Sequence, residues 1–270
     1  MRHNEILKRR DEIAKSGKDI WTNFVFGLRF DENVIDIVDL EKSLMVIVKT
    51  PYQKLGYFVA AGSEELRRLL KRTPMDIFVK WTYKPTRDDL SEIMCQAGFY
   101  LYARYIRNTT VYKSNPYEYP ARGTKALLQE MYDSSCGEFP AVEDAEELFR
   151  LAKKVFDTNS DDVFTVQEWR ERIQKKEVLI YRESGKIIAC YVWRLQGKVL
   201  YSNISINLGL ANILYNMERR VFEQYWNEGI RAHYSWKNCE NKKALKRGLE
   251  NCEECIANKS ILYHSIYTRR

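Results

Sequence analysis

The segment around Gly209 has the residue types and spacing of a phosphate-binding turn. It follows a run of apolar and small polar residues and precedes a stretch, about 211–228, with apolar residues at helical spacing. Glu218 is the first acidic residue of that stretch. A helix N-terminus presents unpaired N–H groups and a partial positive charge, and a glycine lets a ligand approach the backbone. The sequence therefore predicts either an anion site here or a buried strand-to-helix turn without a ligand.

Three side chains that could handle protons lie on two segments with strand character. Tyr201 is on the first, and Tyr234 and Ser235 are on the second. A role in the core or on the strand surface is the other interpretation for each of them. His233, next to Tyr234, is typical of a packed strand histidine, and the chain has no serine in a G-x-S-x-G motif, so a hydrolase triad is not indicated.

Two segments carry residue types that bind metals. The segment Asp157–Glu168 places oxygen side chains at positions 1, 3, 5 and 12 of a calcium loop, but Asp162 stands where that turn needs glycine. The other interpretation is an acidic helix–helix connection in which Thr165 or Asp162 caps the second helix. The CEEC segment (252–255) has no second close cysteine pair, so we expect neither zinc nor redox chemistry there and no resident metal.

The second half of the chain has the periodicity to position these residues. The pattern predicts helices at 143–156 and 165–176, strands at 177–183, 186–196 and 198–206, a long helix at about 211–228, a strand at 230–236, a short helix at 241–250 and a strand at 257–267. This order is that of an α+β fold with a mixed α/β sheet. Its central strand–helix–strand unit can pair its strands in parallel.

The first half shows a similar order of elements. The pattern predicts a charged helix within 1–18, strand segments at 36–50 and 56–61, a helix at 63–72, a strand at 75–83, a helix at 86–98 and a strand at 99–112. The segment SNPYEYPARG (114–123) contains two prolines and a glycine and is the candidate linker. We therefore predict an N-terminal lobe at 1–114, a linker at 115–125 and a C-terminal lobe at 126–270.

The second half resembles the GNAT superfamily of acyl-coenzyme A transferases. In that family a central strand leads into a loop R/Q-x-x-G-x-G/A; here the loop reads INLGLA, in which Gly209 and Ala211 match and Ile206 replaces Arg or Gln. The family then shows Asn-x-x-Ala-x-x-Leu-Tyr. In NKKALKRG, Asn241 and Ala244 match, but Arg247-Gly248 stands where Leu-Tyr would be, and that tyrosine is the usual general acid. The strand at 198–206 also lacks the glutamate base that the family often has.

The resemblance implies a site for acetyl-CoA or another acyl-CoA in the C-terminal lobe. The backbones of Ser205 and Ile206 would pair with the pantetheine amides, and Asn238 or Asn241 would hydrogen-bond the pantetheine arm. The pyrophosphate would be held by the main-chain N–H groups of Leu208, Gly209, Leu210, Ala211 and Asn212. Such an enzyme works mainly by positioning an amine against a thioester carbonyl.

The first half resembles a second, degenerate copy of the same fold. Ser63 is a candidate N-cap of the helix at 63–72, and Glu64 and Glu65 stand in its first turn, where they would repel a pyrophosphate. We therefore expect the N-terminal lobe to bind no nucleotide and to be structural or to form one wall of the acceptor cleft. Tandem lobes of this kind resemble the Fem-type aminoacyl transferases and the N-myristoyltransferases.

Composition limits the remaining classes of protein. The 270 residues include 45% hydrophobic and 13% aromatic residues, which excludes disorder, and the net charge of +7 is modest for a tRNA-binding protein. Arg67, Arg68, Lys71 and Arg72 share one helix and could touch a polyanion or form a solvated face. The chain begins without a signal peptide, its one charge-free stretch of membrane-spanning length is rich in asparagine, and its six cysteines suit a reducing compartment. We expect a cytoplasmic protein that does not bind membranes.

These observations predict an acyltransferase, an N-acetyltransferase in the first instance. It would move an acyl group from acyl-CoA to the amine of a small-molecule or peptide acceptor. Two alternatives stay open: a Fem-type transferase that uses aminoacyl-tRNA, and a catalytically degenerate binding or scaffold protein with the same fold.

Overall fold

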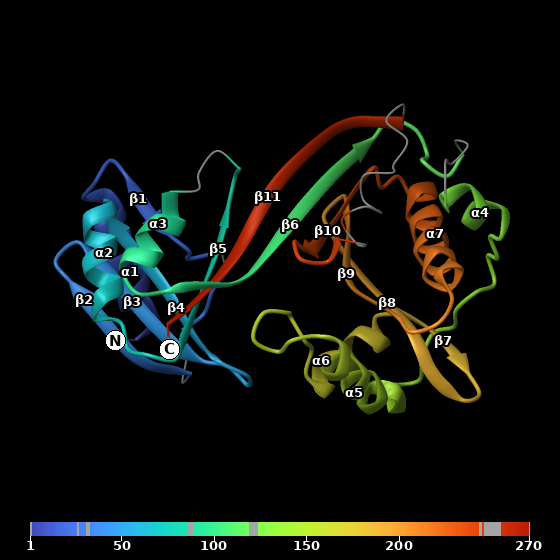
Figure 1. Cartoon of the computed structure of the whole chain (residues 1–270), viewed down its shortest axis with the longest axis horizontal. Helices are drawn as coiled ribbons and strands as arrows, with labels where there is room; N and C mark the ends of the chain where they lie inside the picture. The colour runs from blue at the N-terminus through green and yellow to red at the C-terminus, as the bar shows by residue number, and fades with distance from the viewer. Residues whose placement is uncertain are drawn as a thin grey trace. The chain divides into compact units, whose positions relative to one another are not determined.

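The computed structural model describes residues 2–25, 27–30, 33–85, 89–118, 124–242, 245 and 255–269, and it divides into two compact units (Figure 1). Unit 1 comprises Met1–Tyr105 with Leu262–Arg270, and unit 2 comprises Ile106–Ile261. Two long strands, β6 (Tyr100–Tyr112) and β11 (Ile256–Arg269), contribute residues to both units. The division therefore differs from the ranges 1–114, 115–125 and 126–270, because the chain changes unit within a strand rather than at the proline-rich segment.

Unit 1 contains most of the elements predicted for the first half. They are α1 (His3–Lys15), β1 (Ile20–Thr22), β2 (Val34–Leu40), β3 (Ser43–Lys49), β4 (Lys54–Ala61), α2 (Ser63–Arg72), β5 (Ile77–Tyr83) and α3 (Asp89–Gln96). The strand order is β2-β3-β4-β5-β11-β6, and β1 pairs with β4. The segment 36–50 forms two strands rather than one, because polar Glu41 and Lys42 make a turn between its apolar runs.

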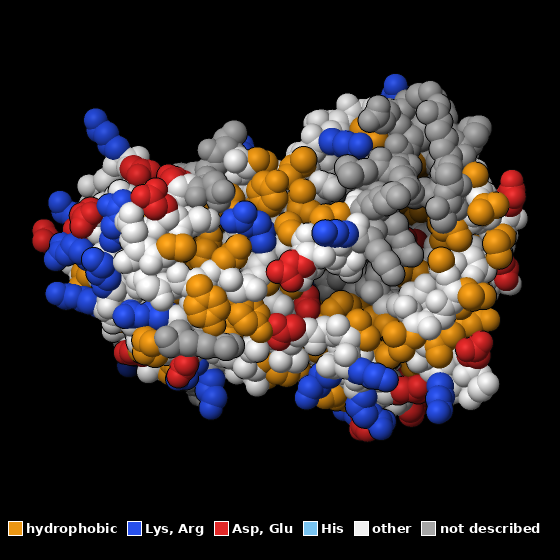
Figure 2. All heavy atoms as spheres, viewed as in Figure 1, with side chains coloured by type: hydrophobic (Ala, Val, Ile, Leu, Met, Phe, Trp, Pro, Cys, Tyr) orange, Lys and Arg blue, Asp and Glu red, His pale blue; other side chains and the backbone are white. Residues whose placement is uncertain are grey.

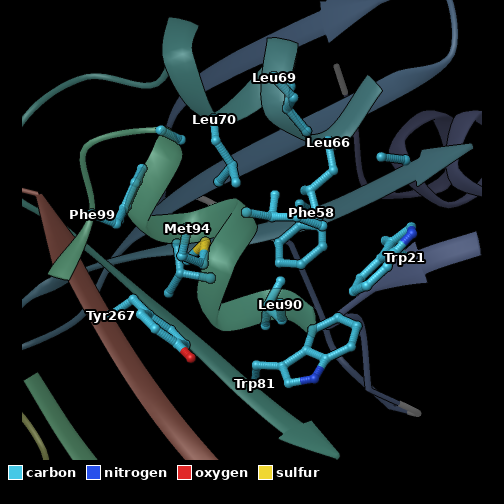
Figure 3. Packing of buried hydrophobic residues seen from close by; sticks show 14 of the residues in the cluster. Trp21, Phe58, Leu66, Leu69, Leu70, Trp81, Leu90, Met94, Phe99 and Tyr267 are labelled. Carbon is cyan, nitrogen blue, oxygen red and sulfur yellow. The ribbon is translucent and has the colours of Figure 1, made fainter. Parts of the chain in front are cut away.

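The core of unit 1 lies on both faces of its sheet. Side chains alternate along β3 and β4, so that Met45 and Phe58 pack with α2 and α3, and Leu44 and Val59 pack with α1. Figure 3 shows the first of these layers, in which Trp21 from β1 lies beside the strand side chains. The layer is closed by Leu66, Leu69 and Leu70 of α2 and by Leu90 and Met94 of α3.

Unit 2 contains the elements predicted for the second half. They are α4 (Thr124–Glu130), a short 3-10 helix η1 (Val142–Asp144), α5 (Ala145–Val155), α6 (Val166–Gln174), β7 (Val178–Glu183), β8 (Lys186–Gln196), β9 (Val199–Asn207), α7 (Ala211–Asn227) and β10 (Ala232–Asn238). The strand order is β6-β10-β9-β8-β7. The helix α4 was not predicted. Most of the predicted helix at 241–250 and of the CEEC segment lies outside the described residues.

Helices cover both faces of the sheet in unit 2, as Figure 1 shows. Leu148 of α5 and Trp169 of α6 pack on one face against apolar residues of β7 and β8, and Leu214 and Met217 of α7 pack on the other. The parallel pairing of β9 with β10 across α7 is confirmed. The chain thus has the mixed α/β architecture that its periodicity predicts. In the described part of the chain, no helix is both long and apolar enough to cross a membrane.

Candidate functional site

The strands β9 and β10 separate halfway along β9. They pair in parallel over four residues, from Val199 with Ala232 to Ser202 with Ser235. Beyond Ser202, β9 continues to Asn207 in antiparallel pairing with β8, and among the described strands none pairs with its opposite edge there. An unpaired strand edge presents backbone N–H and C=O groups that can bind an extended ligand. The separation therefore creates a binding edge ahead of α7.

The predicted backbone residues Ser205 and Ile206 lie on this edge. The Ile206 side chain is buried in the core beneath α5 and α6, so only its backbone can contact a ligand. Ser205 is exposed, with its Oγ 3.5 Å from Oε1 of Glu218 on α7. The register of β9 against β8 also shifts, with Val192 opposite Ile204 and Trp193 opposite Ser202. This bulge leaves Asn203 without a partner on β8 at the point where β10 departs.

The N-terminus of α7 begins at the end of the open edge. Leu210 is the N-cap residue, no side chain caps the helix, and its first turn holds no acidic residue. Leu208, Gly209, Leu210 and Ala211 are all exposed. Because the helix start carries partial positive charge without a local carboxylate, the electrostatic condition for an anion site is met.

The loop before α7 is shaped by its own side chains. Oδ1 of Asn207 accepts a hydrogen bond from the Gly209 amide at 3.0 Å, and the Leu208 amide donates to the Ile188 carbonyl at 2.8 Å. A Cβ on Gly209 would lie 2.8 Å from Ile188 Cδ1 and 2.9 Å from Ile213 Cδ1. A side chain at position 209 would therefore have to displace the ends of two isoleucine side chains.

These hydrogen bonds reduce the number of main-chain amides that could bind a phosphate. The Leu208 and Gly209 amides, predicted to hold the pyrophosphate, already have protein acceptors. The amides of Ala211 and Asn212 belong to the first turn, where the helix itself supplies no acceptor. They are therefore the main-chain donors that best suit an anion, together with the exposed Leu210 that precedes them.

Four side chains form a row across neighbouring strands where β9 and β10 separate. The row consists of Arg107 on β6, Tyr234 on β10, Tyr201 on β9 and Arg194 on β8, and we call it the arginine–tyrosine row. The tyrosine rings stack with centroids 4.4 Å apart. The Arg194 Cζ lies 4.9 Å from the Tyr201 centroid, and the Arg107 Cζ lies 4.8 Å from that of Tyr234. Arg107 also lies 5.4 Å from the ring of Trp236.

The two tyrosines of the row keep their protons at neutral pH. Burial raises the pKa of Tyr201, and the charge of Asp162 raises it further. Burial also raises the pKa of Tyr234, whose hydroxyl hydrogen-bonds to Gln196. Both hydroxyls are therefore protonated near pH 7 and can serve as hydrogen-bond donors. Ser235 follows Tyr234 in the strand and therefore faces the opposite side of the sheet.

His233 belongs to a buried hydrogen-bonded chain on the α7 face. Its Nε2 lies 2.7 Å from Ser202 Oγ, which lies 2.6 Å from the Tyr191 hydroxyl, and its ring meets Phe222 edge-on. Burial and, to a smaller extent, the charge of Lys237 lower the pKa of His233 to about 4. The histidine is therefore neutral and packed, as the sequence indicated.

The predicted asparagines lie at and after the end of β10. Oδ1 of Asn238 accepts from the Glu240 amide at 2.8 Å, and the Asn238 carbonyl accepts from the Asn241 amide at 3.1 Å. These two hydrogen bonds form the turn after β10. They leave the side-chain nitrogen Nδ2 of Asn238 for another partner. The matched position Ala244 and the Arg247-Gly248 departure lie outside the described residues.

The calcium-like segment is held by local hydrogen bonds. Glu168, its twelfth residue, accepts from the amide and hydroxyl of Thr165 at 2.7 and 2.9 Å, in a capping box at the start of α6. Asp157 accepts from the Asn159 amide at 2.9 Å, and Asp161 accepts from the Asp157 amide at 2.9 Å. Thr165 is the N-cap, which confirms the capping interpretation. Within the described ranges, no group of three or more His, Cys, Asp or Glu is placed to hold a metal ion.

In unit 1, the segment β4–α2–β5 has the same strand–helix–strand order as β9–α7–β10, but its helix begins differently. The N-cap is Gly62, at φ +105°, and Ser63 is the first helical residue, so the prediction of Ser63 as N-cap was wrong. Only glycine adopts that backbone conformation readily. Glu64 and Glu65 occupy the first turn as predicted and pair with Arg67 and Arg68 at 2.9 and 2.8 Å. Two of the four basic residues on this helix are therefore neutralised. Figure 2 shows basic and acidic side chains interspersed on the face that it draws.

The strand edge of β4 is covered by the chain itself. The strands β4 and β5 pair in parallel at one position, Leu55 with Phe78, and β1 then pairs with β4 over Val59–Ala61. Asn23, just after β1, donates to the carbonyls of Gly56 at 2.9 Å and Lys80 at 3.0 Å. Its Oδ1 accepts from the Phe58 amide at 2.6 Å. The gap between β4 and β5 is thus bridged by hydrogen bonds within unit 1.

The sequence predictions missed Arg107, Arg194 and Asn23. Each interacts with residues far away in the chain, and none belongs to a local motif. The two arginines lie inside predicted strands, where a charged residue between apolar neighbours suggests a polar face but not its partners.

Comparison with known proteins identifies the fold. No model of a known protein family and no curated protein matches the chain. The GCN5-related glucosamine N-acetyltransferase region of a fungal multi-domain GH3 β-N-acetylglucosaminidase superposes with a TM-score of 0.50 at 8% identity, over 82% of this chain and 31% of that one. A protein described as a GNAT-family acetyltransferase from Novosphingobium aromaticivorans has a TM-score of 0.48 at 11% identity, over 84% and 88% of the two chains. A GCN5-related N-acetyltransferase from Sphaerobacter thermophilus has a TM-score of 0.47 at 13% identity, over 82% and 76%. The chain has the GNAT acyltransferase fold.

Proposed function

We propose that unit 2 binds acyl-CoA between the open edge of β9 and the start of α7, and that the protein transfers the acyl group to an amine. The observation that supports this most directly is the separation of β9 from β10 immediately before a helix that no side chain caps. Unit 1 has the same strand–helix–strand order, but there β1 and Asn23 cover the edge and two glutamates occupy the helix start. We therefore assign the cofactor to unit 2 alone.

The residues present suit the chemical groups of acyl-CoA. The unpaired backbone at Ser205 and Ile206 offers donors and acceptors to the amides of an extended pantetheine arm. The first-turn amides of α7 offer donors to a pyrophosphate. Because Ile206 replaces the Arg or Gln of the family loop, the phosphate contacts would come from the main chain.

The chain would contribute two things to the reaction: it would position the amine, and it would donate hydrogen bonds to the reacting groups. Acyl-CoA supplies a thioester, and holding an amine against it accounts for much of the rate in such a transfer. The bulge at Asn203 releases backbone from the ladder beside the point of strand separation, where an N–H could stabilise an oxyanion. Tyr201 and Tyr234 hold their protons at neutral pH and would offer a hydrogen bond to the departing thiolate, which takes up the proton that the amine loses.

Thermal unfolding with acetyl-CoA and longer acyl-CoA esters tests this proposal. At 100 times its dissociation constant a ligand stabilises the folded state by about 2.7 kcal/mol, which raises the melting temperature of a chain of this size by a few degrees. Ala211→Glu places a carboxylate in the exposed first turn of α7, where it favours the helix but repels a phosphate. We expect this variant to fold normally and to lose the shift.

Ala211→Gln is the matched control, because it has the same size without the charge and should keep the shift. This position is a better choice than Gly209, where any side chain would collide with Ile188 and Ile213. No shift with any ester at millimolar concentration would contradict acyl-CoA binding and favour a scaffold role or an aminoacyl-tRNA donor. A full shift in Ala211→Glu would place the cofactor elsewhere in the molecule.

A further inference from the structure

We propose that the arginine–tyrosine row binds an anionic group of the acceptor, so that the substrates are amines that also carry a carboxylate or a phosphate. This inference rests on the proposed acyl transfer and adds the chemical class of the acceptor to it. The observations that support it are two arginines without an ion pair, the geometry of the row and its position where β9 and β10 separate.

Both arginines of the row lack an acidic partner. Among the described residues, no carboxylate lies within 4.0 Å of Arg107 or Arg194, although both side chains are half-buried. Arg182 in the same unit contrasts with them, because it pairs with Glu138, Asp144 and Glu147. Arginines withdrawn from water are normally paired. The Nε of Arg107 is buried and has no hydrogen-bond partner. The charge of Asp162 reaches Tyr201, so the row has two arginine charges against one acidic charge, and an anion would neutralise the excess.

The stacking of the row prepares its arginines to bind an anion. Each guanidinium lies over a tyrosine ring, and Arg107 lies near the Trp236 ring as well. Stacking engages the flat face of a guanidinium and leaves its N–H edge for hydrogen bonds to planar oxygen groups. At Arg194 this edge contacts the side-chain oxygen of Gln196, 2.8 Å from Nη2 in the amide orientation that satisfies both groups, and a ligand would replace that contact. Arg194 stands directly opposite Tyr201 in the β8–β9 register, and Tyr201 stands opposite Tyr234 in the β9–β10 register. The sheet therefore fixes both charges before a ligand arrives.

The position of the row assigns it to the acceptor rather than to the phosphates of the cofactor. Tyr201 precedes Leu208 by seven residues, which along a strand is roughly 20 Å. The phosphates would lie at the far end of that distance, at the start of α7. The row stands where β9 and β10 still pair, two residues before the edge opens at Asn203. An anion bound there would hold the acceptor at the acyl end of the cofactor.

Matched pairs of acceptors test the inference through their relative rates. We would compare β-alanine with propylamine and O-phosphoethanolamine with ethanolamine, following release of the free thiol from acetyl-CoA. We expect the wild type to favour the anionic member of at least one pair by about tenfold or more in kcat/KM, as charge-assisted hydrogen bonds of this kind allow. The pair that shows the preference distinguishes a carboxylate from a phosphate.

Variants of the row decide whether it causes that preference. Arg107→Gln and Arg194→Gln should abolish it, mainly through KM for the anionic acceptor, and Arg107→Lys should retain part of it. Arg170→Gln, an exposed arginine of α6, is the matched control and should change nothing. If the arginine–tyrosine row is purely structural, the Gln variants should be less stable, but their ratio of kcat/KM between the anionic and the neutral acceptor should equal that of the wild type. That result would overturn the inference.

A binding measurement makes the test independent of turnover. Inorganic phosphate and succinate should raise the melting temperature of the wild type more than that of Arg107→Gln at constant ionic strength. If acetyl-CoA stabilises the protein but neither anion distinguishes the variants, the inference fails and the proposed function stands. If the anions distinguish the variants but acetyl-CoA does not bind, the anion site stands and the proposed acyl transfer fails.

Discussion

The strand–helix–strand segments β4–α2–β5 of unit 1 and β9–α7–β10 of unit 2 have the same order of elements. They differ in whether the free strand edge and the start of the helix are covered. In both, a strand leads through a short loop into a helix, and the next strand pairs in parallel with the first. In unit 1, β1 and Asn23 occupy the free edge of β4. In unit 2, the corresponding edge of β9 beyond Ser202 has no partner among the described strands, and the helix start has no acidic residue.

This difference shows how one strand–helix–strand arrangement can have its free strand edge either covered or open. The backbone groups exposed where two parallel strands separate must find partners, since buried unpaired groups are costly. Unit 1 provides them from its own chain, and its helix start is neutralised by Glu64 and Glu65. Unit 2 leaves the same positions for a ligand. Function therefore depends on the residues around the strand edge more than on the fold itself.

The largest effect should come from removing the bridge in unit 1. Asn23→Ala deletes three hydrogen bonds to main-chain groups of Gly56, Phe58 and Lys80. Because those groups would lose their partners, we expect the free energy of unfolding to fall by about 3 kcal/mol in urea denaturation. Asn207→Ala is the control in unit 2, where exposed hydrogen bonds should cost about 1 kcal/mol. Equal losses in the two variants would contradict the importance of the bridge.

Mild acid should weaken unit 2 through His233. Burial lowers the pKa of His233 to about 4, so the fold favours the neutral ring, whereas the unfolded chain takes up a proton below about 6.5. This contribution to stability is complete above pH 6.5 and is lost as the pH falls toward 4. We expect a loss of about 2 kcal/mol, allowing for the partial exposure of the ring.

His233→Gln is the test of that pH dependence. It removes the titrating group and should flatten the difference in urea stability between pH 7 and pH 4.5. Because His233 lies on β10 and its ring hydrogen-bonds to Ser202 of β9, the loss of protection in hydrogen exchange should begin in these two strands. An unchanged pH profile in His233→Gln would rule out this histidine as the cause.

Much of the fold could be predicted because periodicity reports burial locally. The helix at 63–72 and the strand at 186–196 have the predicted limits, since each has a clear amphipathic or apolar pattern. The sharing of β6 and β11 between the units could not be predicted. Arg269 pairs with Ile77, and no local pattern specifies a partner at that separation. The strand β1 was missed because three residues are too few to show a period.

The site could be predicted in outline for the same reason. The turn at Gly209 and the acid-free start of α7 are local features, and both are present. The stacking of Tyr201 on Tyr234 and the placement of Arg107 and Arg194 depend on the register between strands, which sequence alone does not give. The coverage of the β4 edge is likewise a tertiary contact, so the expectation that unit 1 binds no nucleotide gains a second physical reason.

The glycines before the two helices should respond differently to alanine. Gly62 has φ +105° and no atom near its missing Cβ, so Gly62→Ala strains the backbone and should cost about 2 kcal/mol. Gly209 is limited by Ile188 and Ile213, so Gly209→Ala should cost about 1 kcal/mol. Adding Ile188→Val removes the nearer of the two methyl groups and should restore part of the second loss. Gly62→Ala has no such rescue, because its cost comes from the backbone and not from a neighbouring side chain. Urea denaturation of the variants measures both losses.

The smallest effect should come from neutralising the helix start of unit 1. Glu64→Gln with Glu65→Gln removes two carboxylates that favour the helix N-terminus and pair with Arg67 and Arg68, so stability should fall by about 0.5–1 kcal/mol. Made in the Ala211→Glu background, the double change should not restore the acetyl-CoA-dependent shift, because β1 still covers the β4 edge. A restored shift would mean that charge alone separates the two units. Its absence would show that the strand edge must also be open.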